Sequence, residues 1–224
     1  WRIKHNPIME QSHYISSEVL SLEVIQEIIS QNKKLALSDE AKVAIEKCRT
    51  YLDTKMASND EPIYGINTGF GSLCNVKISS ENLSQLQENL VKSHASGTGE
   101  AVPHEIVKIM LLLKIQSLSY GHSGVQLQTV DRLIDFYNND ILPIIYTQGS
   151  LGASGDLAPL AHLSLPLLGE GEVYYDGFRQ PASKVLEKMN WKPIILQSKE
   201  GLALLNGTQF MSAYGSYILL KAMK

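Results

Sequence analysis

Residues 149–172 read GSLGASGDLAPLAHLSLPLLGEGE, and the character of this stretch changes at Asp156. Before Asp156, three glycines fall within seven residues and predict a loop, because glycine adopts backbone conformations that other residues avoid. After Asp156, the apolar run 157–168 predicts a helix that starts at Asp156 and has Pro166 near its end. A loop that leads directly into a buried helix is therefore expected here.

Apolar residues at helical spacing recur along most of the rest of the chain. Residues 106–118 are apolar nearly all round, which is typical of a central buried helix, and Pro103 suits the first turn of that helix. Residues 57–75 are rich in glycine, asparagine and serine and predict a long loop, a feature that is often functional. Further helices are predicted around residues 20–29, 38–52, 79–94 and 130–137.

Only one β element is predicted. Residues 173–179 (VYYDGFR) are typical of a small hairpin on an Asp-Gly turn, and residues 193–197 indicate extended chain or loop. The expected fold class is therefore mainly α with a minor β-hairpin.

The composition excludes several classes of function. The 20 Lys and Arg residues nearly balance the 23 Asp and Glu residues without a basic block, which argues against nucleic acid as a partner. The run 106–118 is too short and too polar to span a membrane, and no segment is typical of a signal peptide. Two cysteines, Cys48 and Cys74, do not make a disulfide scaffold and indicate a reducing, cytoplasmic location.

The two ends of the sequence lead to expectations about domain boundaries. Residues 1–8 lack an initiator methionine, and Met9 opens a more ordinary beginning, so 1–8 is expected to precede the natural start or to be an addition. Residues 207–224 form an apolar segment that stops without a helix cap, so we expect a cut within a helix and a larger parent protein.

Single residues do not decide the function. Ala153-Ser154-Gly155 lacks the last glycine of a serine-hydrolase elbow, and no lysine follows in the position that a phosphate-binding loop needs. Tyr64 has an ordinary explanation as a packed aromatic, His94 as a core histidine and Asn206 as a turn or N-cap residue. No two histidines have the H-x-x-x-H spacing of a zinc site, so no metal is expected.

Four motifs taken together are informative. They read YGINTGFGSL (64–73), NLVKSHASGTGE (89–100), the opening stretch 149–172, and EGLALLNGTQ (200–209). In this order and at these separations they closely resemble the aromatic amino acid ammonia-lyase family, from about residue 17 to the last residue.

The resemblance implies a prosthetic group made from the chain itself, a methylidene-imidazolone (MIO), with no external cofactor or metal. The Gly155 nitrogen would attack the Ala153 carbonyl, and Ser154 would lose its hydroxyl to become an exocyclic methylene. Glycine leaves the attacking nitrogen unobstructed, and serine has the leaving group that dehydration needs. Asp156 is similar to the family residue that assists this cyclisation.

The implied reaction eliminates ammonia from an amino acid. By resemblance, Tyr64 is the base that takes the β-proton, and Asn206 hydrogen-bonds the substrate or the electrophilic ring. The pair Ser93-His94 is typical of family members that act on L-histidine and release trans-urocanate. The resemblance implies four substrate-binding positions, Ser93, His94, Gly71 and Leu205.

Alternatives stay open at this point. His122 stands where the histidine-specific members commonly have tyrosine, so a tyrosine lyase or a tyrosine aminomutase with the same prosthetic group is a second possibility. Family members are about twice this length and form homotetramers with shared active sites, so a truncated, non-catalytic assembly module is a third. The resemblance implies an N-terminal domain over 9–206, which carries the electrophile, and the start of a truncated central helical bundle over 207–224.

Overall fold

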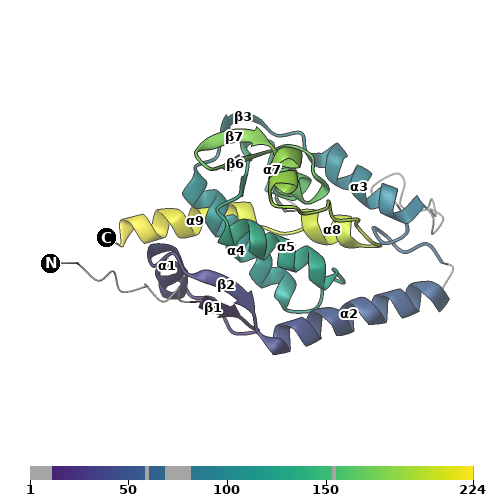
Figure 1. Cartoon of the computed structure of the whole chain (residues 1–224). Coiled ribbons are helices and arrows are strands. Elements are labelled where there is room, and N and C mark those ends of the chain that lie inside the picture. The colour runs from purple at the N-terminus through teal and green to yellow at the C-terminus, as the bar shows by residue number, and fades with distance from the viewer. Residues whose placement is uncertain (1–11, 59–60, 69–81, 153–154, 224) are drawn as a thin grey trace.

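The computed structural model describes residues 12–58, 61–68, 82–152 and 155–223 (Figure 1). Over these ranges the chain is mainly helical, which confirms the predicted fold class. The helices are α1 (Leu22–Ser30), α2 (Asp39–Ser58), α3 (Leu83–His94), α4 (His104–Ser119), α5 (Leu127–Asn138), α6 (Leu157–Ser164), α7 (Ala182–Lys188), α8 (Glu200–Leu205) and α9 (Gln209–Ala222), and a 3-10 helix, η3, covers Leu165–Leu168.

Helix α4 runs through the middle of the molecule and contacts α2, α5 and α9 (Figure 1). Its residues Met110, Leu111, Leu112 and Ile115 have no exposed surface, so the predicted central helix is confirmed. Pro103 immediately precedes the helix as its N-cap instead of lying in the first turn. Neither α4 nor any other helix in the described ranges is long and apolar enough to cross a membrane.

Within the described ranges, three small sheets lie among the helices. β1 (Ser12–Ile15) and β2 (Lys34–Leu37) pair in parallel, and β3 (Thr98–Ala101) pairs with β5 (Tyr146–Gln148) in antiparallel fashion. The third sheet contains β4 (Leu142–Pro143), β6 (Glu172–Tyr175) and β7 (Phe178–Pro181).

The predicted hairpin is the β6–β7 pair, and its turn has the expected geometry. Asp176 has a φ of 56° and Gly177 a φ of 84°, so both turn residues are left-handed, as a two-residue hairpin with the right twist requires. The other strands were not predicted from the sequence.

Among the differences from the prediction, two concern the helices α6 and α8. The helix after Asp156 changes from α to 3-10 at Leu165, because Pro166 has no N–H to donate to the preceding turn. Helix α8 was not predicted, and Asn206 is the cap that ends it, whereas Thr208 precedes α9.

Candidate functional site

A cavity of about 360 Å³ lies between the end of α3, the loop before Gly155 and the start of α6. It brings together three residues that the sequence identified, namely Ser93, His94 and Gly155. The described residues that line it are Ser93, His94, Ser96, Gly149, Leu151, Gly155, Leu157 and Ala158.

The two glycine-rich loops of the cavity are held together by the β3–β5 pair and by His162 of α6. A Cβ atom on Gly149 would lie 3.0 Å from the Cα of Gly97, so the loops approach each other as closely as glycine permits. The Gly97 N–H donates to His162 Nε2 over 3.0 Å. Burial lowers the pKa of His162, which favours the neutral ring that can accept this bond.

The carbonyl oxygen of Leu90 orients both Ser93 and His94. His94 Nδ1 lies 2.7 Å from this oxygen and Ser93 Oγ lies 3.2 Å from it. Because a carbonyl oxygen only accepts, Nδ1 of His94 carries the proton in this contact. The end of α3 thus fixes how the two side chains face the cavity.

Gly155 rests directly against the turn that follows α8. Its φ is +110°, and a Cβ added to it would lie 2.9 Å from the Gly207 carbonyl oxygen and 3.5 Å from Asn206 Oδ1. The Asp156 N–H donates to the same Gly207 oxygen over 2.7 Å. Only glycine fits position 155, and the contact places Asn206 beside it.

Asp156 is fully buried and joins three segments. Its Oδ1 accepts from Ser150 Oγ over 2.9 Å, and its Oδ2 accepts from the Met211 N–H over 3.0 Å in the first turn of α9. The start of a helix favours a negative charge, so the carboxylate is well placed there. Its side chain therefore makes no cap bond to α6, although the residue occupies the cap position as predicted.

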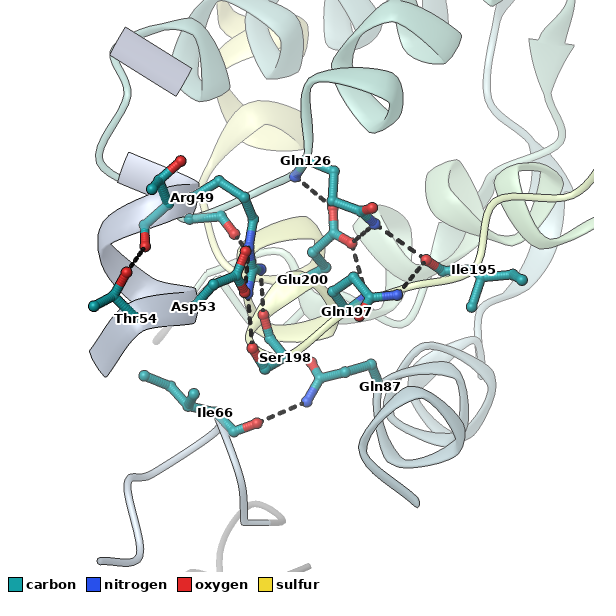
Figure 2. Close-up of polar contacts among 12 residues, drawn as sticks. Arg49, Asp53, Thr54, Ile66, Gln87, Gln126, Ile195, Gln197, Ser198 and Glu200 are labelled. Atoms are coloured by element: carbon teal, nitrogen blue, oxygen red, sulfur yellow. Dashed lines mark hydrogen bonds and ion pairs between the residues drawn. The ribbon is translucent and has the colours of Figure 1, made fainter. Parts of the chain in front are cut away.

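Tyr64 does not line the cavity in the described part of the chain, and 54% of its surface is exposed. The segment that carries it is nevertheless well anchored. Asn67 Oδ1 accepts from the Ile63 N–H over 2.6 Å. Figure 2 shows the second anchor, in which Gln87 Nε2 donates to the Ile66 carbonyl over 3.3 Å. Gln87 belongs to α3, so the cavity and the segment of Tyr64 share a support.

A buried polar network holds the start of α8 (Figure 2). The Glu200 carboxylate accepts from the Gln126 N–H over 2.9 Å, from Thr129 Oγ1 over 2.7 Å and from the Gln197 N–H over 2.8 Å. Nearby, Arg49 pairs with Asp53 and donates to the carbonyls of Gly124 and Ser198. The buried charges of Glu200 and Arg49 are therefore both satisfied. Their contacts fix where α8 begins, and hence where Asn206 lies at its end.

Leu205 does not line the cavity and is fully buried in the core. Gly71, Ala153 and Ser154 lie outside the described residues. No group of three or more His, Cys, Asp or Glu side chains in the described ranges could hold a metal ion.

The sequence reasoning did not single out the other residues that line the cavity. These are Ser96, Gly149, Leu151, Leu157 and Ala158. The sequence marked them only as members of the same motifs, 89–100 for Ser96 and 149–172 for the other four.

Comparisons with known proteins identify the family of this chain. Residues 20–224 match the aromatic amino acid lyase family. Histidine ammonia-lyase of Deinococcus radiodurans is 49% identical over 87% of this chain, which spans 37% of that protein. The crystal structure of histidine ammonia-lyase from Trypanosoma cruzi superimposes with a TM-score of 0.85 at 35% identity, covering 95% of this chain and 41% of that one. The crystal structure of tyrosine aminomutase from Streptomyces globisporus superimposes with a TM-score of 0.87 at 32% identity, covering 94% of this chain and 39% of that one.

Proposed function

Because this chain belongs to the aromatic amino acid lyase family, we propose that it forms part of an enzyme that converts L-histidine into trans-urocanate and ammonia. The chain spans about two fifths of the length of the relatives it matches, so the activity is assigned to the whole protein. The observation that carries the proposal is the cavity that joins Ser93 and His94 to Gly155.

We assign Ala153, Ser154 and Gly155 to an MIO prosthetic group formed from the chain. Gly155 fits this assignment, because its left-handed φ and the lack of room for a Cβ suit a backbone that must fold tightly on itself. Asp156, buried beside it, would support the cyclisation. Once formed, the group supplies an electrophile that makes the substrate's amine a better leaving group. The proposal needs no external cofactor or metal.

The chain's own residues would position the substrate and move its proton. Asn206 has its side-chain oxygen beside Gly155 and would hydrogen-bond the substrate or the ring. Ser93 and His94 would contact the substrate side chain in the cavity, and Gly71 completes this set. Leu205 is fully buried and does not line the cavity, so its substrate-binding role rests on the family resemblance alone.

Tyr64 is the proposed base for the β-proton, although it does not line the cavity of its own chain in the described ranges. An assembly of four copies with shared active sites, as the family resemblance implies, would let Tyr64 serve the cavity of another copy. The anchoring of its segment by Asn67 and Gln87 is consistent with this role, because a base must be held in place. We also propose a cytoplasmic location, as the two cysteines of the sequence predict.

The substrate assignment rests on Ser93-His94 and on the relatives named as histidine ammonia-lyases, which are 43–49% identical. His122 favours a second candidate, a tyrosine lyase or tyrosine aminomutase. The structural similarity to a tyrosine aminomutase is in keeping with this alternative.

The test is product formation by the full-length protein with L-histidine and, separately, L-tyrosine. We expect the ultraviolet absorbance of urocanate to appear with L-histidine, to be lost in Ser154→Ala and to persist in the control Ser30→Ala, which changes an exposed serine on α1. Urocanate formation at the wild-type rate by Ser154→Ala would refute the proposal. Release of p-coumarate or a β-amino acid from L-tyrosine would establish the second candidate.

A further inference from the structure

Lys114 is a buried charged residue in the apolar helix α4. Only 1% of its surface is exposed, and no carboxylate pairs with it in the part of the chain that the structure describes. Burial lowers the pKa of its amine to about 7. A lysine without a carboxylate partner is costly in a protein core, so its contacts indicate what it is for.

The hydrogen bonds that Lys114 makes to described residues lie at the end of α8. Its Nζ donates to the Ala203 carbonyl over 2.7 Å and to the Asn206 carbonyl over 3.1 Å. The last carbonyl groups of a helix have no partners within the helix, so they accept hydrogen bonds from donors outside it. Lys114 therefore satisfies the end of α8 from a different helix.

The peptide bond between Asn206 and Gly207 connects these contacts to the candidate site. Its carbonyl oxygen accepts from Lys114, and its nitrogen belongs to Gly207 and lies 3.3 Å from the position of a Cβ on Gly155. The next carbonyl, that of Gly207, accepts from the Asp156 N–H. One peptide unit thus separates the amine of Lys114 from the surface against which Gly155 and Asp156 rest.

We propose that Lys114 is a positioning residue for the prosthetic-group segment: by holding the Asn206 carbonyl, it fixes the Asn206–Gly207 peptide that supports the backbone of Gly155. This inference rests on the proposed function, because it concerns the cyclisation of Ala153, Ser154 and Gly155. Lys114 itself contacts neither the segment nor the cavity in the described ranges. Its effect passes through the turn after α8.

The experiment compares Lys114→Met, Lys114→Arg and the control Lys47→Met in the full-length protein. Methionine keeps an unbranched chain without donors, arginine keeps the donors at a different reach, and Lys47 is exposed on α2. The readouts are thermal unfolding and the rate at which the protein loses two waters, about 36 Da, measured by intact mass at successive times after synthesis. A variant that only destabilises the fold would unfold at a lower temperature, but its folded protein would lose the two waters as the wild type does.

We expect folded Lys114→Met to dehydrate on the order of tenfold more slowly than the wild type, Lys114→Arg to be intermediate, and Lys47→Met to be unchanged. Dehydration at the wild-type rate in a folded Lys114→Met or Lys114→Arg would overturn the inference. Failure of both variants to fold would also overturn it, because Lys114 would then be a general core residue. A wild type that never loses water would instead refute the proposed function.

Discussion

Replacing Lys114 with methionine should make the stability of the protein less dependent on pH in the mildly alkaline range. In the unfolded chain the lysine regains its ordinary pKa of 10.5, whereas burial lowers the pKa to about 7 in the folded protein. Between these two values the unfolded state binds a proton that the folded state does not bind. The free energy of unfolding therefore rises with pH from about 7, and this contribution is complete only above 10.5.

The magnitude follows from this difference in bound protons. One proton bound only by the unfolded state changes the free energy of unfolding by about 1.4 kcal/mol per pH unit. From about pH 7.5 to about pH 9, where the folded lysine is mostly neutral, the wild type should gain about 2 kcal/mol more than Lys114→Met.

Urea unfolding followed by circular dichroism at these two pH values measures the difference directly. Groups that titrate in both proteins cancel in the comparison, so the difference belongs to Lys114. The exposed Lys47→Met should show the wild-type gain. Equal gains in the wild type and Lys114→Met would refute the reasoning, because they would mean that the amine stays protonated in the folded state.

Three further substitutions test other parts of the structure. Gly155→Ala should destabilise the protein by about 4 kcal/mol, because the new methyl carbon would lie 2.9 Å from the Gly207 oxygen. The control Gly177→Ala, at a φ of +84° with no atom within 4 Å of the new carbon, should cost only about 1–2 kcal/mol. Equal losses of stability in urea unfolding would contradict the close contact at Gly155. His162→Gln should reduce the loss of stability as the pH falls below 6.5, because burial lowers the pKa of His162 and the unfolded wild type then binds a proton more readily than the folded one. Parallel curves of stability against pH in the variant and the wild type would contradict this. Glu200→Gln should lower the free energy of unfolding by about 2–4 kcal/mol, because three residues donate hydrogen bonds to the carboxylate and the amide nitrogen of glutamine cannot accept them. An unchanged melting temperature would argue against the network.

The sequence was sufficient for the long helices and the hairpin, because their signals are local. Helix α4 is apolar nearly all round, and Asp176-Gly177 specifies its turn by itself. Helix α8 was missed for the opposite reason. It has six residues, follows Lys199 with a left-handed φ of 71°, and depends on Glu200 bonds to residues more than 70 positions away. Periodicity cannot reveal an element of this kind.

The candidate site was predictable as a set of residues and only partly as an arrangement. The motifs identified Ser93, His94 and Gly155, and the structure places them around one cavity. They also identified Tyr64, which lies elsewhere on its own chain. Lys114 could not be assigned a role from the sequence, because its partners at Ala203 and Asn206 are 89 and 92 residues away. A lysine among leucines indicates only that its amine has some buried hydrogen-bond acceptor.

The mass of the peptide that contains Ala153, Ser154 and Gly155 is the decisive measurement for the proposed chemistry. In full-length protein that converts L-histidine to urocanate, this peptide should be lighter than its sequence by two waters, about 36 Da, and the same peptide from Ser154→Ala should not show that loss. An active protein whose peptide has the full mass of its sequence would contradict the proposal that the chain makes its own electrophile.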